Sequence, residues 1–357
     1  MDNQGTPEIR RKTKYGQTAG IGIALSLAVC LLILLTAIRA GSVYISIPDL
    51  IKIVGSHITG RPLPPEVDPM NDSIFWSIRM PRAITAFLVG GALSVSGAVM
   101  QAVLQNPLAS SYTLGVSSGA SLGAAFVLLC GLSFAGMESF MLPLAGFVFG
   151  LVTVVAAILL ASRIDRSVSN QTIVLIGVIL SLFVTGIMNL LMTFYGDKSK
   201  QLWLWMTGSF SARNWTHCAV LFGAGIFGFV ILMMLSGRLD ILTFGELQAS
   251  SMGVEVKKTK IIAMLVCSLL TGVSVAFSGV IGFIDLAAPH VVRKIFGPSH
   301  KIVIPMSFIY GGAFMALCDL ASRTLLSPRE IPVGAVTALV GAPFFAYVFF
   351  AKGRRKA

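Results

Sequence analysis

The apolar side chains of this sequence fall into long runs with almost no charge, and these runs limit the possible folds. The composition agrees, because 55% of the residues are hydrophobic and 12% are charged, against about 25% charged in soluble globular domains. Each run is long enough to cross the hydrocarbon core of a bilayer, which is about 30 Å thick. Lipid offers the backbone no hydrogen-bond partners, so spanning runs fold as helices. The ten runs are residues 20–38, 80–104, 112–131, 139–161, 171–195, 217–236, 261–280, 282–297, 302–321 and 332–351.

These runs predict an all-α polytopic membrane protein with ten transmembrane helices. An even number of spans places both termini on one side of the membrane. With the N-terminus in the cytoplasm, the cytoplasmic segments hold 17 Lys and Arg residues and the outer segments hold 10, as the positive-inside rule requires. We expect a basic cytoplasmic N-terminus over 1–19, a transmembrane domain over 20–351 and a basic cytoplasmic tail over 352–357. The first run exceeds the signal-peptide length of about 7–15 apolar residues, so we expect it to be retained.

One stretch, residues 79–121, combines a row of small side chains with a break in the helix pattern. Small residues recur every fourth position and would form one helix face, at Ala86, Gly90, Ser94, Ala98 and Ala102. Such a face allows a neighbouring helix to approach closely. A buried helix followed by an irregular polar segment is also typical of a transport pathway. The candidate pathway-lining residues are Ser94, Ala98, Gln101 and Asn106.

Three segments between the runs are long enough to fold outside the membrane. The outer segment 39–79 contains an amphipathic pattern, SIPDLIKIVGSHITG, that predicts a short helix with Pro48 near its start. The outer segment 196–216 predicts a short interfacial helix that ends at Gly208. The cytoplasmic segment 237–260 is polar and interrupted by glycines, which predicts two short helices joined by a glycine turn. A loop of that shape could dock a soluble partner.

The sequence shows no catalytic or metal-binding motif. It contains no Gly-x4-Gly-Lys-Ser/Thr phosphate loop, and its five cysteines and four histidines are scattered. We therefore expect no catalytic residue, no metal site and no cofactor on this chain. Asp285 is the only carboxylate that could serve an ion-coupled carrier, and we place it near the outer end of its span.

Three arginines are predicted at the outer face: Arg79, Arg82 and Arg323. Arginine binds carboxylates bidentately, so a cluster at a pore mouth could dock an acidic partner. The alternative is that these side chains snorkel at the membrane boundary. Asp319 lies four residues before Arg323, so the two share a helix face and can pair.

Seven motifs, in order, resemble the permease subunits of type II ABC importers for iron-siderophores, haem and vitamin B12. The resemblance covers residues 20–352, and one position departs from it, since Asp285 stands where glycine is usual. The motifs are RMPR (79–82), GGALSVSGAVMQAVLQNPLA (90–109), LGVSSGA (114–120), WMTGSF (205–210), FGELQASSMGV (244–254), SGVIGFIDLAAPHVVRKIFGPSHK (278–301) and EIPVGAVTALVGAPFF (330–345).

The resemblance implies a type II ABC importer permease fold in a prokaryotic cytoplasmic membrane. It implies a second permease subunit, identical or related, two cytoplasmic ATPase subunits that carry ATP and Mg, and an extracytoplasmic substrate-binding protein. It also implies that 237–260 forms coupling helices on the ATPases, a role carried to Gly245, Glu246, Ala249 and Gly253, and that Arg79, Arg82 and Arg323 meet glutamates of the binding protein.

The implied cargo is a metal chelate, of which an iron(III)-siderophore is the commonest in the family and haem or vitamin B12 the alternatives. Two other hypotheses remain open from the residues alone. An ion-coupled secondary transporter would work without an ATPase and would depend on Asp285, and a membrane scaffold would use 237–260 only for docking.

Overall fold

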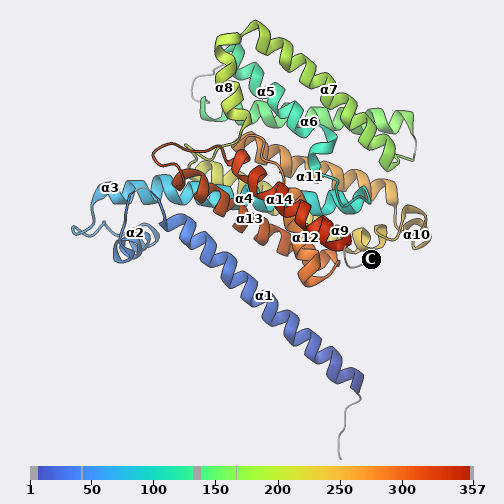
Figure 1. The fold of residues 1–357 in the computed structure, drawn as a ribbon, viewed down its shortest axis with the longest axis horizontal. Helices are drawn as coiled ribbons and strands as arrows, with labels where there is room; N and C mark the ends of the chain where they lie inside the picture. The colour runs from blue at the N-terminus through green and yellow to red at the C-terminus, as the bar shows by residue number, and fades with distance from the viewer. Residues whose placement is uncertain (1–6, 42, 132–137, 166, 354–357) are drawn as a thin grey trace, which may run out of the picture.

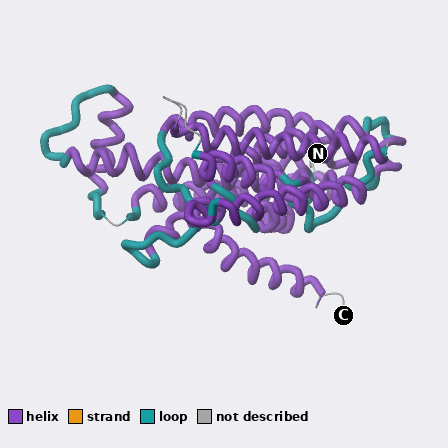
Figure 2. The backbone as a smooth tube through the Cα atoms, turned by 90° about the horizontal axis from the view of Figure 1, so that it is seen from above, coloured by secondary structure: helices purple, strands orange, loops and turns teal. Residues whose placement is uncertain are grey.

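The computed structural model describes residues 7–41, 43–131, 138–165 and 167–353, and the secondary structure in these ranges is helical (Figures 1 and 2). The helices are α1 (Pro7–Arg39), α2 (Ile47–Thr59), α3 (Pro69–Asp72), the π-helical turn η1 (Ser73–Arg79), α4 (Met80–Val103), the 3₁₀ turn η2 (Ser111–Leu114), α5 (Val116–Cys130), α6 (Glu138–Ile164), α7 (Asn170–Phe194), α8 (Gly196–Met206), α9 (Trp215–Leu242), α10 (Glu246–Ser251), α11 (Val256–Ser278), α12 (Ile284–Phe296), α13 (His300–Thr324) and α14 (Val333–Gly353).

Every predicted apolar run coincides with a helix, but the number of membrane crossings is not confirmed as ten. Within the described ranges, seven helices are long and apolar enough to cross a membrane, and two shorter apolar helices lie at 116–130 and 333–347. The run 282–297 folds as α12, which has 13 residues and is therefore about 20 Å long. That length is too short to cross the hydrocarbon core alone.

The terminal segments are described only in part. Residues 7–19, which we expected to precede the first span, continue the helix of α1. Residues 1–6 of the predicted N-terminal segment and 354–357 of the predicted tail lie outside the described residues. In Figure 1, α1 leaves the bundle obliquely, and it contacts α13, where Ser26 Oγ and Tyr310 OH lie 2.8 Å apart.

Helix α4 forms the centre of the bundle, and α9, α11, α12 and α13 surround it. Its small residues are packing positions. A Cβ added to Gly90 would lie 3.0 Å from the carbonyl carbon of Gly311 on α13 and closer to the carbonyl oxygen. A Cβ added to Gly97 would likewise overlap the backbone of Asp285 on α12, at 2.6 Å from its carbonyl carbon. Gly90, in the predicted row, therefore lets α13 approach α4 at backbone contact, as predicted. Gly97, which lies outside that row, does the same for α12.

A break between α11 and α12 brings α12 into the interior of the bundle. Gly279 and Phe283 both have positive φ, 74° and 71°, and they bracket the break. Ser94 Oγ donates to the carbonyl of Ile284 at 3.3 Å, so α12 begins beside the second half of α4. Asp285 packs on Gly97, 15 residues along α4 from Arg82, a distance of about 22 Å. Asp285 therefore lies in the first turn of its helix, as predicted, but that turn begins well inside the bundle.

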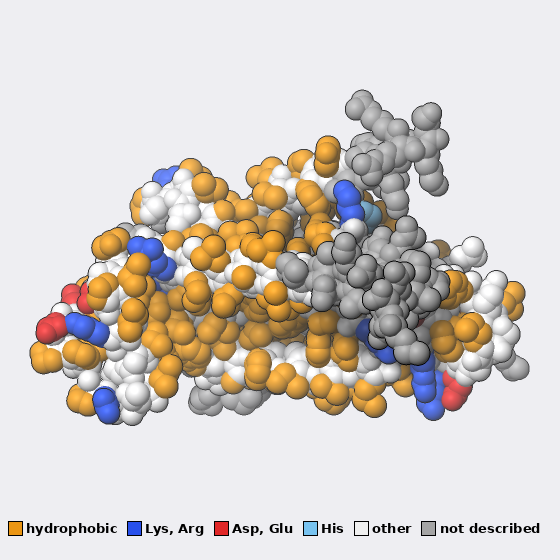
Figure 3. Space-filling view, turned by 90° about the horizontal axis from the view of Figure 1, so that it is seen from below, with side chains coloured by type: hydrophobic (Ala, Val, Ile, Leu, Met, Phe, Trp, Pro, Cys, Tyr) orange, Lys and Arg blue, Asp and Glu red, His pale blue; other side chains and the backbone are white. Residues whose placement is uncertain are grey.

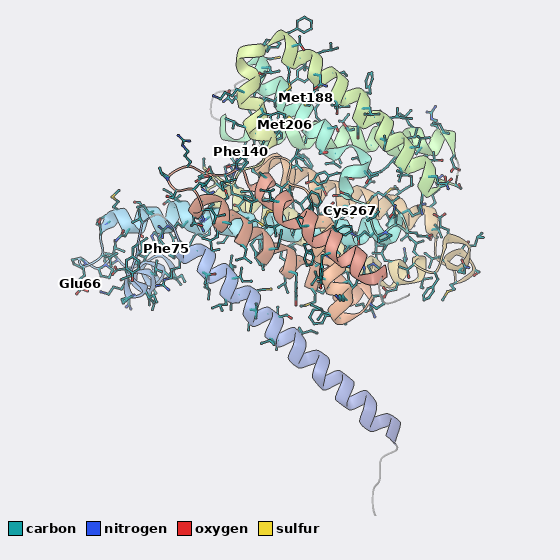
Figure 4. All side chains as sticks on the ribbon, viewed as in Figure 1. Glu66, Phe75, Phe140, Met188, Met206 and Cys267 are labelled. Carbon is teal, nitrogen blue, oxygen red and sulfur yellow. The ribbon has the colours of Figure 1, made fainter. Side chains whose placement is uncertain are left out.

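A second layer of helices, α5 to α8, packs on the α11 side of this centre (Figure 1). Figure 4 shows Met188 of α7 and Met206 of α8 in this layer, apart from Cys267 on α11. The surface seen in Figure 3 is hydrophobic over its middle, and acidic side chains appear toward its two ends. This pattern is the one expected of a bundle surrounded by lipid.

The two predicted short helices outside the spans are confirmed. α2 begins after Ser46, whose hydroxyl accepts from the amide of Asp49, and it ends at the left-handed Gly60. Its Ile53 packs with Phe75 of η1 in a small separate core, at the end of the bundle where Figure 4 labels Phe75 and Glu66. α8 ends at Met206, just before the left-handed Gly208.

Candidate functional site

Two groups of functional candidates lie at opposite ends of the bundle. The arginine end holds the first turns of α4, the last turn of α13 and the loop before α14, while α10 marks the other end (Figure 1). α4 joins the two ends, because Gln105 just beyond it donates from Nε2 to the carbonyl of Leu242 at 3.1 Å. Leu242 is the last residue of α9, three residues before the turn into α10.

At the arginine end, Arg82 is buried and bound by two carboxylates of the same chain. Its Nε donates to Asp319 Oδ1 at 2.9 Å. Its two terminal nitrogens donate to Glu330 Oε1 at 2.6 Å and Oε2 at 3.1 Å, a bidentate pair. Ser211 adds a hydroxyl bond to Glu330 Oε2 at 2.8 Å. The guanidinium that we expected to face an acidic partner is thus already neutralised.

Partial burial by itself raises the pKa of Glu330, but the hydrogen bonds from Arg82 and Ser211 and the charge of Arg82 outweigh it. The pKa of Glu330 therefore lies below its ordinary value. The carboxylate stays ionised and paired at neutral pH.

The other two predicted docking arginines bind backbone carbonyls at the end of α1 and in the segment just after it. Arg79, 4% exposed, donates to the carbonyl of Arg39 at 2.9 Å and to that of Val43. Arg323 donates to the carbonyl of Ala37, and its Nε lies 3.4 Å from Asp319 Oδ2. The expected pairing of Asp319 with Arg323 is present, and Asp319 shares its charge between two arginines.

Sequence reasoning missed the pocket that these residues border. The pocket has a volume of about 400 Å³ and is lined by Ser77, Arg82, Ser211, Arg213, Asn214 and Glu330, among others; we call it the arginine pocket. Two of its residues, Arg82 and Glu330, lie in the RMPR and EIPVG motifs. Their pairing could not be predicted, because they are 248 residues apart in the sequence and meet only in the fold.

At the other end, the segment 237–260 holds one short helix, so the prediction of two is wrong. α9 continues through Leu242, and α11 begins at Val256, which leaves room only for α10. Gly245 and Gly253 flank α10 with φ of 115° and 83°, values that favour glycine. The predicted glycine interruption therefore occurs twice, once on each side of the helix.

α10 is fastened to the bundle by a buried lysine. Lys260 on α11 has a fully buried side chain and donates to Glu246 Oε1 and to the carbonyl of Val168, each at 2.7 Å. Ala249 is buried on the inner side of α10. Of the residues that the resemblance assigned to coupling, Glu246 and Ala249 hold α10 in place, and the glycines set its turns.

The outer side of α10 is apolar and exposed. Phe244, Leu247 and Met252 are 72%, 85% and 62% exposed. A cleft of about 950 Å³ lies between α10 and the start of α11 and is lined by Leu247, Lys257 and Ile261, among others. Exposed apolar side chains gathered beside a cleft are typical of protein interfaces.

Of the four predicted pathway-lining residues, three are buried inside this chain and one is exposed. Ser94 and Ala98 are fully buried and Gln101 is 6% exposed, because they pack inside the bundle against α12 and α13. Gln101 accepts from Arg293 of α12 and donates to the carbonyl of Asp285 at 3.3 Å. Asn106 alone is exposed, and it caps its own turn by accepting from the amide of Leu108 at 2.9 Å. Ser94, Ala98 and Gln101 therefore pack between helices of this chain, and the expectation that the four residues line a pathway stays a prediction.

Asp285 is also a buried packing residue. It accepts a hydrogen bond from the Ser110 hydroxyl, which joins α12 to the segment between α4 and η2. Among the described residues, no group of three or more His, Cys, Asp and Glu side chains is arranged to hold a metal ion.

Comparison with known families and proteins relates the whole helical domain to transport proteins. The family described as the FecCD transport family matches residues 28–351. The uncharacterized ABC transporter permease protein YvrB of Bacillus subtilis is 37% identical, over 90% of this chain and 91% of that protein.

Two further relatives carry a named cargo. The Fe(3+)-citrate import system permease protein YfmE of Bacillus subtilis is 31% identical, over 97% of this chain and 100% of that protein. The vitamin B12 import system permease protein BtuC of Photorhabdus laumondii is 36% identical, over 76% of this chain and 80% of that protein.

A solved structure has the same arrangement of helices. It is described as an inward-facing conformation of a proposed metal-chelate type ABC transporter, and it covers 93% of this chain and 98% of its own chain. The TM-score is 0.79 at 28% identity. The similarity therefore extends from the arginine end to α10.

Proposed function

The chain belongs to the FecCD transport family, and on that premise we propose that it is the permease subunit of an ATP-driven importer whose cargo is a metal chelate, most simply an iron(III)-siderophore. The observation that carries the proposal is the family match over residues 28–351, which includes every helix from α2 to α13. A relative named for Fe(3+)-citrate, matched over 97% of this chain, supports a ferric chelate.

The exposed face of α10 is proposed to dock an ATPase that carries ATP and Mg. Leu247 and its apolar neighbours supply the contact, and the cleft beside them can receive a ridge of the partner. Two such ATPases and a second permease subunit, identical or related, would complete the transporter. The end of the bundle marked by α10 would then face the cytoplasm, in the prokaryotic inner membrane, and both termini would lie on the cytoplasmic side.

The arginine end is proposed to receive an extracytoplasmic binding protein. Arg79, Arg82 and Arg323 stabilise this surface through hydrogen bonds within the chain. If the binding protein docks on them, its carboxylates must replace acceptors that these arginines now use. Because α4 joins the arginine end to the turn before α10 through Gln105, a displacement at either end is transmitted along a single packed helix.

Haem and vitamin B12 are the alternative cargoes, and the relative named for vitamin B12 import favours the second at 36% identity. The test is uptake by proteoliposomes that contain the permease, with and without its ATPase and its binding protein. The proposal expects uptake of a ferric siderophore that requires both partners and ATP hydrolysis. Uptake of cobalamin alone would favour the alternative.

An ion-coupled carrier is distinguished by the same vesicles. It would give uptake without the ATPase, driven by a proton gradient and abolished in D285N. Uptake of that kind would overturn the proposal of an ATP-driven importer. A scaffold would copurify with the ATPase and give no uptake of any chelate.

A further inference from the structure

The short helix α2 carries an apolar face that is exposed on the described chain. Ile47, Ile51 and Ile58 are 50%, 68% and 75% exposed. With about 100° of rotation per residue, they lie within about 40° of one another around the helix axis. Ile53 lies on the far side of α2 and is buried with Phe75 of η1. α2 therefore packs on the bundle with one apolar face and presents a second, formed by Ile47, Ile51 and Ile58, which we call the isoleucine face.

Contacts on the other sides of α2 hold the isoleucine face in a fixed direction. The ring of His57 stacks on Trp76, with ring centroids 4.1 Å apart. Its Nε2 also lies 2.8 Å from Asp72 Oδ1. Lys52 forms an ion pair with Glu66 in the loop that follows α2. Because these contacts join α2 to both the loop and η1, the isoleucine face is presented by a folded unit and not by a loose segment.

α2 lies across the bundle, whereas the spanning helices run along it. In Figure 1 α2 is seen nearly end-on, and in Figure 2 it crosses the long axis at the same end of the bundle. The long axis follows the spanning helices and is therefore close to the membrane normal. It follows that α2 lies close to the membrane plane, which is the orientation of interfacial amphipathic helices.

Two tryptophans place α2 at the depth of the membrane surface. Trp76 stacks on α2 through His57, and Trp215, the first residue of α9, donates from Nε1 to the carbonyl of Trp76 at 3.0 Å. Tryptophan is enriched where membrane meets water. The chain also reaches α2 from α1, whose apolar stretch is only 11% buried, through residues 40–46 alone. The isoleucine face therefore lies beside a surface that lipid covers.

We propose that α2 is an interfacial membrane helix whose isoleucine face inserts among the lipids of the leaflet at the arginine end, which the proposed function makes the outer leaflet. Helices of this kind bury their apolar face about 5–10 Å into the boundary between headgroups and acyl chains. The occupant of the face is lipid, because α2 lies in the membrane plane at the level of the tryptophans. The proposal depends on the chain spanning a membrane and not on its cargo or its ATPase.

The inserted helix holds the start of α4 at a fixed depth. α2 packs on Phe75 of η1, and η1 continues into α4 at Met80 without a break. Arg79, between them, also binds the carbonyls of Arg39 and Val43 on either side of the turn from α1 to α2. The anchor therefore acts on the central helix of the bundle through packed contacts.

The charges near α2 make insertion an apolar effect and not an electrostatic one. Anionic lipids attract basic segments, but residues 46–72 hold more acidic than basic side chains. The acidic residues are Asp49, Glu66, Asp68 and Asp72, and the basic ones are Lys52 and Arg61. The depth of α2 should therefore be the same in neutral and in anionic bilayers.

Nitroxide labels at two consecutive residues test the insertion. Ile58 and Thr59 are both exposed, but they lie about 100° apart around the helix, so T59C is the matched control for I58C. Each variant is made in the full-length chain with C130S, because Cys130 is the exposed one of the five free cysteines. The labelled proteins are placed in phosphatidylcholine nanodiscs, and collision with oxygen and with a nickel chelate is measured by EPR power saturation.

The proposal expects the label at residue 58 to be at least several-fold less accessible to the nickel chelate than the label at residue 59, and more accessible to oxygen. Equal accessibility to the nickel chelate at the two positions would place the isoleucine face in water and overturn the proposal. Shielding of residue 58 from both reagents would place a protein on the face and would also overturn it.

The same measurement in nanodiscs that contain phosphatidylglycerol tests the apolar origin of the insertion. The two bilayers should give the same accessibilities at residue 58. Insertion that occurs only with phosphatidylglycerol would overturn the proposal, because the lipid would then bind through charge. Neither measurement needs cargo, ATPase or binding protein, so failure of the proposed function leaves both results interpretable.

Discussion

The contact between Gly97 and the start of α12 allows a quantitative test of how the bundle is packed. A Cβ at residue 97 would lie 2.6 Å from the carbonyl carbon and 2.8 Å from the Cα of Asp285, and closer to the carbonyl oxygen. These are backbone atoms, which cannot rotate away, so G97A must push α12 away from α4. We expect the displacement also to weaken the bond from Gln101 to the carbonyl of Asp285.

The magnitude follows from two opposing effects. Overpacking a well-packed core costs about 1–3 kcal/mol, and a weakened buried hydrogen bond adds about 1 kcal/mol. Alanine gains about 1 kcal/mol over glycine in helix propensity. G97A should therefore lose about 1–3 kcal/mol of stability.

The matched control is G272A on α11, where the new Cβ would lie 3.4 Å from Phe147 Cδ2, an ordinary contact. The same chemical change is made there without overlap, so G272A should match the wild type or gain up to about 1 kcal/mol. Thermal unfolding in detergent can be followed with a thiol-reactive dye, because four of the five free cysteines are buried. A Tm for G97A equal to that of G272A would refute the close contact of α4 and α12.

Three further predictions concern the two ends of the bundle. K260M leaves the carboxylate of Glu246 without its buried cation, so it should lower the free energy of unfolding by about 2 kcal/mol. It should also reduce the stimulation of ATPase activity several-fold, measured by phosphate release. Wild-type stimulation in K260M would contradict the role given to this pair. L247D should leave stability within about 0.5 kcal/mol of wild type but reduce ATPase copurification at least 10-fold, and undiminished copurification would show that α10 is not the contact. Folding lowers the pKa of Glu330, so the ionised carboxylate stabilises the fold above the unfolded-state pKa of about 4.3, and this stabilisation is lost as pH falls through the folded-state pKa. E330Q should therefore remove this part of the acid dependence of Tm. Parallel curves of Tm against pH for E330Q and wild type would exclude the contribution of Glu330.

Sequence periodicity predicted the helices well because their apolar runs are long and separated by charged loops. It failed where a helix ends inside the protein. The run 282–297 looks like a span, but the left-handed residues Gly279 and Phe283 move its start inward, and a positive φ at phenylalanine has no signal in the sequence. Asp285 lies in the first turn of α12, as expected, but the sequence did not predict that this turn begins inside the bundle.

The row of small residues on α4 shows a second limit of prediction from sequence. Small residues at every fourth position predicted a close helix approach, and the glycines of α4 and α13 confirm it. The same pattern was also compatible with a pathway lining. Ser94 and Ala98 are buried within this chain, and the pathway lining stays a prediction. A row of small side chains indicates that something approaches the helix closely, but it does not distinguish a neighbouring helix from a transported molecule.

The arginine end shows why a resemblance can locate a surface without giving its present partners. The RMPR motif placed Arg82 at the end of a span, as the structure does. Its carboxylate partners, Asp319 and Glu330, lie 237 and 248 residues away in the sequence, so no local pattern could identify them. Arg213 was missed for the same reason, since the pocket that it lines forms only in the folded chain.

The most direct test of the account is siderophore uptake in vesicles that contain the permease, its ATPase and its binding protein, compared with vesicles in which the ATPase carries a catalytically inactive phosphate loop. The account predicts uptake of the ferric siderophore in the first vesicles and none in the second. Equal uptake in the two preparations would contradict it, because transport would then proceed without ATP hydrolysis.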